Sequence, residues 1–301
     1  MMHNILALDI GATNIKAALF DAQGNLLRQD ERPSHGREGG AAMMNAACEV
    51  IADAGNFAAI GISVTGQVDA ARGRIVFAND NVPGFTGFPV RDYLQERFPV
   101  PVAVENDVNA AALGEAFFGA ARDVEDFLCV TLGTGVGGAV VIGRRIYGGA
   151  DGVAGEVGHM VTHPGGLPCA CGQRGCYEQY ASASALVRSA QTLDACYTSG
   201  RAIFADLEKR EGLRHVVDAW IDEVLVGLAT LTHIFNPRLF VLGGGVAEQP
   251  YVLGALRERL PGRLIPSYRG VRLVGAQLGN MAGAYGALHI ARLALEERAQ
   301  A

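Results

Sequence analysis

Two segments of the chain share one construction, and they constrain its fold more than any other feature. Residues 5–20 read ILALDIGATNIKAALF, and residues 127–142 read FLCVTLGTGVGGAVVI. Each segment is an apolar run, a turn rich in Gly and Thr, and a second apolar run, which predicts two strands joined by a tight turn. Because the two segments lie far apart in the sequence, we expect two lobes of like construction.

The rest of the chain alternates between strand and helix patterns, which is typical of an α/β protein. Its 301 residues exceed the roughly 250–300 at which single cores stop growing, and this also predicts two lobes. We expect a smaller N-terminal lobe at 1–118, joined by the C-terminal helix at 288–301, and a larger lobe at 119–287. The expected strands are 5–9, 15–20, 26–32, 58–64, 101–105, 127–132, 139–142, 239–242 and 271–274. The expected helices are 41–54, 90–98, 108–118, 182–196, 216–235, 252–260 and a last one from about 281.

Composition and charge exclude several classes of partner. Half of the residues are apolar, 19% are charged, and the formal charge is −6, so nothing attracts nucleic acid or an anionic membrane. The N-terminus lacks the basic front and cleavage site of a signal peptide, and no apolar run approaches the ~20 residues of a membrane span. We therefore expect a cytoplasmic protein.

The glycine turns favour phosphate binding without a dinucleotide fold. Residues 133–138, GTGVGG, match the pattern G-x-G-x-x-G, but the pattern requires a helix next, and the β-branched run AVVIG follows. A phosphate-binding lysine is also missing, since the only two lysines, Lys16 and Lys209, follow no glycine-rich loop. Either turn alone is explained by the positive φ that glycine supplies. Two similar turns favour backbone N–H groups that converge on phosphate, with Asp9 beside the first turn as a holder of hydrated Mg²⁺.

Glu105, Asn106 and Asp107 stand between a strand and a helix, at the edge where open α/β sheets bind ligands. Asp107 alone is explained as the cap of that helix. In a sugar kinase, one carboxylate must accept the proton of the attacking hydroxyl, and Asp107 is the candidate for that role.

The segment GHMVTHPGGLPCACGQRGC, residues 158–176, concentrates metal-ligating side chains. Clustered cysteines in a reducing compartment bind metal more often than they form disulfides. A structural Zn²⁺ takes four ligands. Five donors compete for these places: His159, His163, Cys169, Cys171 and Cys176.

These motifs together resemble the ROK group of bacterial sugar kinases and sugar-responsive repressors over nearly the whole chain. LDIGATNIKAAL is similar to the first phosphate loop of that family, LGTGVGGA to the second, VENDVNAAALGEA to the catalytic segment and LGGG to the adenosine corner. GVAGEVGHM is similar to the sugar and metal motif, and CACGQRGCYE to the cysteine motif. The resemblance implies a two-lobed actin-like, ribonuclease H-like ATPase fold with a cleft between the lobes.

The resemblance also implies a role for each matching residue. Asp107 would be the catalytic base. Sugar hydroxyls would be held by Gly66, Asn81, Asn106, Asp107, Glu156, His159 and Glu178. ATP and its Mg²⁺ would be held by Asp9, Gly11, Ala12, Thr13, Asn14, Gly133, Thr134, Gly135, Gly137, Gly243 and Gly244. A structural Zn²⁺ would be held by His159, Cys169, Cys171 and Cys176, which leaves His163 as a loop histidine.

The function that follows is an ATP-dependent hexose kinase, acting on the 6-hydroxyl of glucose or of an N-acetylhexosamine such as N-acetylmannosamine or N-acetylglucosamine, and working as a homodimer. A repressor of the same family would carry a helix-turn-helix domain before the first phosphate loop, and here the first strand begins at Ile5. A non-catalytic sugar-binding protein would lack the acid, and Asp107 is present. Two positions depart from the family: Ala12 replaces a glycine, and Phe85 stands where many members have Trp, which leaves the preferred sugar open.

Overall fold

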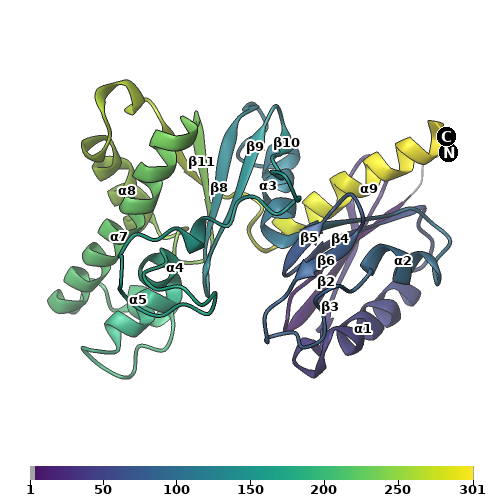
Figure 1. Ribbon diagram of the computed structural model, residues 1–301, viewed down its shortest axis with the longest axis horizontal. Helices are drawn as coiled ribbons and strands as arrows, with labels where there is room; N and C mark the ends of the chain where they lie inside the picture. The colour runs from purple at the N-terminus through teal and green to yellow at the C-terminus, as the bar shows by residue number, and fades with distance from the viewer. Residues whose placement is uncertain (1–3, 301) are drawn as a thin grey trace. The chain divides into compact units, whose positions relative to one another are not determined.

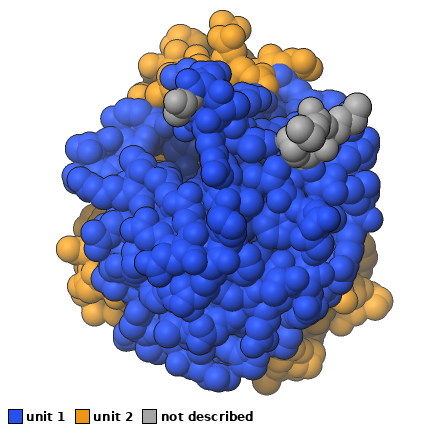
Figure 2. All heavy atoms as spheres, turned by 90° about the vertical axis from the view of Figure 1, so that its right-hand side faces the viewer, with its two compact units in different colours: residues 1–122, 145–154, 280–301 blue, residues 123–144, 155–279 orange. Residues whose placement is uncertain are grey.

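The computed structural model describes residues 4–300, which form two compact units. Unit 1 contains the residues up to 122, residues 145–154 and the residues from 280 onward, and unit 2 contains 123–144 and 155–279. Unit 1 is therefore built from three separate stretches of chain, which Figure 2 shows in blue. The lobe boundaries expected from the sequence, at 118/119 and 287/288, remain predictions.

Unit 1 is organised around a five-stranded sheet with the strand order β3-β2-β1-β4-β7. The first three strands form an antiparallel meander, and β4 and β7 add to it in parallel with β1. A separate two-stranded hairpin, β5–β6, follows β4. The bounds are β1 Ile5–Ile10, β2 Asn14–Phe20, β3 Leu26–Pro33, β4 Ala59–Val64, β5 Gln67–Asp69, β6 Arg74–Phe77 and β7 Val102–Asn106.

Helices cover the two faces of this sheet, and the side chains of β1 alternate between them. Leu6, Leu8 and Ile10 are buried in one core with the side chains of α1, whereas Ile5 and Ala7 are buried in another core against α9. In Figure 1 the yellow C-terminal helix α9 lies along the purple N-terminal strands. The helices are α1 Gly40–Ala52, α2 Val90–Gln95, α3 Asp107–Phe118 and α9 Ala282–Gln300.

The second five-stranded sheet repeats the same plan, with the strand order β10-β9-β8-β11-β12, and its strands β8, β9, β11 and β12 belong to unit 2. The hairpin β8–β9 is antiparallel, and β11 and β12 extend it in parallel with β8. The strands are β8 Phe127–Leu132, β9 Val136–Ile142, β10 Arg145–Ile146, β11 Leu239–Gly243 and β12 Arg272–Gly275. The helices are α4 Glu178–Ala181, α5 Ala183–Ala190, α6 Gly200–Ala205, α7 Glu211–Phe235 and α8 Pro250–Arg259. The two hairpins predicted from the duplicated sequence pattern are β1–β2 and β8–β9.

The structure corrects several element predictions. The helix expected at 216–235 begins at Glu211, the one expected at 90–98 ends at Gln95, and α6 was not expected. The expected helix at 182–196 ends at Ala190, because Thr192 donates its hydroxyl to the Ser189 carbonyl and Asp194 accepts the N–H of Cys196, and such local bonds compete with helix. The expected strand at 139–142 begins earlier, at Val136, so two glycines lie within it. The hairpin β5–β6 was missed, since its strands are three and four residues long. Within residues 4–300, no helix has the length and apolar character to cross a membrane.

Candidate active site and metal centre

Asp107 lies at the junction of β7 and α3, but it is not the cap of that helix. The N-cap is Asn106, whose Oδ1 accepts the backbone N–H groups of Val108 (2.9 Å) and Asn109 (3.1 Å). The Asn106 side-chain amide donates to Asp107 Oδ1 and to the Gly66 carbonyl, both at 2.9 Å. The capping role considered from the sequence therefore belongs to Asn106. Asp107 is left as a partly exposed carboxylate in the first turn of the helix.

The surroundings of Asp107 raise its pKa from 3.8 to about 6. Burial among protein atoms is the largest cause, and the negative charge of Asp9 adds to it. Burial also raises the pKa of Asp9, against a hydrogen bond of 2.7 Å from the Ser63 hydroxyl, which lowers it. Asp9 and Ser63 lie opposite each other on the parallel strands β1 and β4. Unit 1 thus brings two interacting carboxylates to one region, the arrangement in which one carboxyl titrates near neutral pH.

Of the other sugar-contact candidates of unit 1, Gly66 is bonded to this junction and Asn81 lies in a separate loop. Gly66 adopts φ +100° after β4, and its carbonyl is the one that Asn106 binds. Asn81 lies exposed in the loop after β6, where its N–H donates to Asn79 Oδ1. Phe85, on the same loop, is fully buried in the core with α1, so its side chain is a core residue.

The first glycine turn, Gly11–Asn14, is held at both ends. The Gly11 N–H donates to the Asn14 carbonyl, and the Ser34 N–H donates to the Thr13 carbonyl. Asn14 donates its side-chain amide to Glu31. Ala12 is partly exposed, and its carbonyl lies where a side chain on Gly36 would be, so the backbone packs closely here.

The second glycine turn, Gly133–Gly135, lies next to Gly243 and Gly244 in unit 2. Gly133, Thr134 and Gly135 connect β8 to β9, and the Gly133 N–H donates to the Gly135 carbonyl. Gly137 lies within β9. Gly243 ends β11 beside Thr131, and Gly244 follows with φ +97°, where any Cβ would meet the Leu132 carbonyl. Except for Gly137, the glycines predicted to hold ATP in this unit therefore lie at the ends of the adjacent strands β8 and β11. Close backbone packing requires a glycine at position 244.

Glu178, at the start of α4, lies between the second glycine turn and the loop that carries Cys169, Cys171 and Cys176, here called the cysteine loop. A Cβ on Gly135 would lie 2.6 Å from Glu178 Oε2, and Glu178 Oε1 accepts the Cys169 thiol at 3.0 Å. His159 ends the short 3-10 helix Val157–His159, with Nδ1 4.0 Å from Glu178 Oε1 and Nε2 3.9 Å from Glu156 Oε2. The three predicted sugar contacts of unit 2 thus form one group around the His159 ring.

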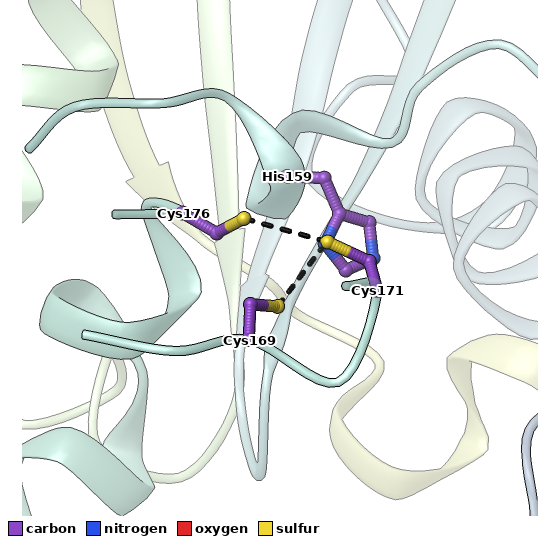
Figure 3. Close-up of side chains that lie close together, drawn as sticks. All are labelled: His159, Cys169, Cys171 and Cys176. Atoms are coloured by element: carbon purple, nitrogen blue, oxygen red, sulfur yellow. Dashed lines mark hydrogen bonds between the residues drawn. The ribbon is translucent and has the colours of Figure 1, made fainter. Parts of the chain in front are cut away.

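Four predicted zinc ligands converge, as Figure 3 shows: His159, Cys169, Cys171 and Cys176. Their ligand atoms all lie within 4.8 Å of one another. The Cys171 and Cys176 sulfurs are 3.5 Å apart, and Cys169 Sγ is 3.6 Å from His159 Nδ1. One imidazole and three thiols at these separations are a donor set that can hold a metal ion.

The thiols of this group are in opposed environments. Burial raises the pKa of Cys169 to about 12 and also raises the pKa of Cys176, whereas a backbone hydrogen bond from Gln173 lowers the pKa of the exposed Cys171. Three adjacent thiolates require a cation to be stable, and a bound metal provides that charge.

His163 lies apart from the four ligands. Its ring stacks on Tyr180 at 3.8 Å, and its Nε2 is 3.5 Å from Glu223 Oε1 on α7. The Tyr177 hydroxyl donates to the Val224 carbonyl of the same helix. His163 and Tyr177 therefore fasten the cysteine loop to α7.

Sequence reasoning missed Ser63, and it placed Glu105 at the ligand-binding edge of the sheet without giving it a role. Ser63 is fully buried and donates to Asp9, and Glu105 is 8% exposed and accepts hydrogen bonds from Asn106 and Asn109. The available signal was a polar residue within each buried strand, in GISV and VAVEN. Such residues need a hydrogen-bonding partner.

The chain is similar to known proteins over nearly its whole length. The model of the ROK family matches residues 5–294. The chain is 35% identical to the glucokinase of Streptomyces coelicolor, over 95% of this chain and 97% of that protein. It is similar in structure to a ROK hexokinase from Thermus thermophilus (36% identity, TM-score 0.84, 98% of this chain and 99% of that one). It is also similar to a ROK glucokinase from Streptomyces griseus solved with glucose and AMPPNP (34% identity, TM-score 0.83, 96% and 99%). The predicted fold class is confirmed.

Proposed function

This chain belongs to the ROK family, and on that premise we propose that it phosphorylates a hexose with ATP, with Asp107 as the base. The chain is an ATP-dependent sugar kinase, and its acceptor is the 6-hydroxyl of glucose or of an N-acetylhexosamine. The observation that carries the proposal is the carboxyl of Asp107, whose pKa is raised to about 6 by burial and by the negative charge of the partly exposed Asp9.

Asp107 performs the proton transfer. Above its pKa of about 6 the carboxylate accepts the proton of the attacking sugar hydroxyl, and general-base help of this kind is worth ~10²–10⁴-fold in rate. Asn106 holds Oδ1 of Asp107 in place, and the same amide ties that carboxylate to the loop at Gly66. The proposed sugar contacts are the residues that the family resemblance implies: Gly66, Asn81, Asn106, Asp107, Glu156, His159 and Glu178.

The nucleotide is assigned to the glycine turns. Backbone N–H groups of Ala12–Asn14 and Thr134–Gly137 bind phosphate oxygens, whereas those of Gly11 and Gly133 donate within their own turns and shape them. Gly243 and Gly244 leave room for the adenosine. Asp9 fits a magnesium ion, because it is a carboxylate oxygen donor with one oxygen already oriented by Ser63. Magnesium, when bound, neutralises charge on the transferred phosphoryl group.

Zinc is proposed for the group of His159, Cys169, Cys171 and Cys176, since imidazole nitrogen and thiolate sulfur are the ligands of structural zinc sites. This ion would order the loop that presents His159 and Glu178, without contacting ATP. The same residues that hold the loop would then shape the sugar site.

We also propose a homodimer in the cytoplasm. Exposed apolar side chains support the dimer: Ile234 and Ile265 are 63% and 55% exposed, and a hydrogen bond from the Ile265 N–H to His233 places them near one another. The six cysteines are free thiols, in keeping with a reducing compartment. Sedimentation at several concentrations tests the dimer.

A coupled assay of ADP release tests the function, with glucose, N-acetylglucosamine, N-acetylmannosamine and mannose each offered with MgATP. We expect the highest kcat/KM with glucose or one N-acetylhexosamine. The matched control is Asp107→Asn. ADP release that does not depend on sugar, or that Asp107→Asn leaves unchanged, contradicts the proposal.

A further inference from the structure

Glu105 is a nearly buried carboxylate beside Asp107 that the proposed reaction does not use. It is 8% exposed, and burial raises its pKa. On β7 it lies level with Ser63 of β4, which in turn lies level with Asp9 of β1. Because successive side chains of a strand point to opposite faces, Glu105 leaves the sheet on the face opposite to Asn106. An acid in such surroundings costs free energy of folding unless its hydrogen bonds compensate.

One oxygen of Glu105 binds both sides of the strand-to-helix junction. Oε1 accepts the backbone N–H of Asn106 at 2.9 Å and the side-chain amide of Asn109 at 3.0 Å. Asn106 is the last residue of β7, and Asn109 belongs to the first turn of α3. Asp107 lies between these two partners in the chain. Glu105 therefore fixes the backbone that enters the Asp107 turn and the helix that leaves it.

The bonds of Asn106 carry this constraint to the carboxylate. Its amide donates to Asp107 Oδ1 at 2.9 Å, and its Oδ1 accepts the N–H of Asn109, whose side chain is the one that binds Glu105. The three side chains thus form a closed set of hydrogen bonds around Asp107. Asn109 is 5% exposed, so this partner of Glu105 is not easily replaced by water.

We propose that Glu105 is a positioning residue for the base Asp107, acting through Asn106 and Asn109 with its acceptor oxygen and not with its charge. The inference rests on the proposed function. Small displacements of a reacting group can cost on the order of 10²-fold in rate, and the loss of a junction that holds the base is of this kind. Glu105 does not touch substrate in this assignment, so its loss affects turnover more than substrate binding.

Two substitutions separate the acceptor from the charge. Glu105→Gln keeps a carbonyl oxygen for Asn106 and Asn109, and Glu105→Leu removes it at similar volume. At pH 8, with the sugar that the wild type prefers, we expect Glu105→Leu to lower kcat about 10–100-fold and to change KM for sugar and ATP less than about threefold. Glu105→Gln should stay within about threefold of wild type. Glu96→Leu, in which an acid with 75% side-chain exposure in unit 1 is replaced, is the matched control.

A double-mutant comparison tests whether Glu105 acts through the base. In the Asp107→Asn background, Glu105→Leu should cause no further loss of the residual turnover, because residues that act as a unit are not additive. A loss of equal factor in both backgrounds overturns the inference, and so does a Glu105→Gln variant as slow as Glu105→Leu. If Glu105→Leu fails to fold, Asn109→Ala removes the same hydrogen bond from the other partner and is measured in the same two backgrounds.

The wild-type chain separates this inference from the proposed function. No sugar-dependent turnover by wild type with any hexose overturns both. An active wild type whose kcat equals that of Glu105→Leu overturns the inference alone.

Discussion

Replacing the proposed base by its amide should make the protein more stable while making it inactive. Asp107→Asn keeps an oxygen for the two bonds that Asp107 Oδ1 accepts, from Asn106 and from the Val108 N–H. It removes a carboxylate that burial and Asp9 hold in its protonated form up to a pKa of about 6. Above pH 6 the ionisation of Asp107 destabilises the folded wild-type chain, and this destabilisation is absent in the variant.

The magnitude follows from the pKa. The rise from 3.8 to about 6 is about 2 units, and at about 1.4 kcal/mol per unit it corresponds to about 3 kcal/mol. Asp107 is partly exposed and shares its repulsion with Asp9, so we expect about 1–3 kcal/mol. Because native Asp107 binds its proton more tightly than the unfolded chain does, wild-type stability falls as pH rises from about 4 to 6. The advantage of the variant should be near zero at pH 4 and complete above about pH 7.

Thermal unfolding at pH 4, 6 and 8 measures this, beside kcat at pH 8. A stabilisation of about 1–3 kcal/mol raises the melting temperature by roughly 2–10 °C in a unit of this size. Turnover should fall ~10²–10⁴-fold in the same variant. The electrostatic reasoning is refuted if the variant is less stable than wild type at pH 8, or if its gain in stability over wild type is the same at pH 4 and pH 8. A variant with near-normal turnover refutes the role as base.

Three further outcomes are expected. The kcat of wild type should fall below about pH 6 as Asp107 takes up its proton, and a pH–rate profile with no limb between pH 5 and 7 counts against this base. Cys171→Ser should lower zinc content, melting temperature and sugar affinity together. His163→Ala should retain the metal, and loss of metal in that variant would make His163 the ligand. Gly244→Ala, at φ +97° and against the Leu132 carbonyl, should raise KM for ATP more than KM for sugar, and equal rises would separate Gly244 from the nucleotide.

The sequence predicted the fold where periodicity and turns agreed. The duplicated hairpins β1–β2 and β8–β9 and the strands β4, β7 and β11 carry long apolar runs bounded by glycine or by polar residues. They appear within about one residue of their expected bounds, except that β9 begins three residues earlier, at Val136. The β5–β6 hairpin has strands of three and four residues, too short for an alternating pattern. The helix expected beyond Ala190 yields to side-chain bonds of Thr192 and Asp194, which apolar periodicity does not record.

The candidate site was predicted unevenly for a similar reason. The histidine and cysteines of the metal group are rare side chains at short spacing, and the structure brings all four together. The choice of cap between Asn106 and Asp107 depends on one backbone angle, which sequence leaves undetermined. Ser63 and Glu105 sit in buried strands, and their roles depend on strand register between segments distant in the chain.

The composition of unit 1 has a consequence for biosynthesis. Ile5, Ala7, Phe20 and Ala59 are buried against α9, whose residues 282–300 are translated after the whole of unit 2. At about 5–20 residues per second, roughly 9–35 s separate the completion of the N-terminal sheet at Asn106 from the arrival of α9 at Ala282. Until α9 is made, the apolar sheet face that it covers has no partner helix, and we expect unit 1 to be prone to aggregation during that interval even though its sheet is the first to be made.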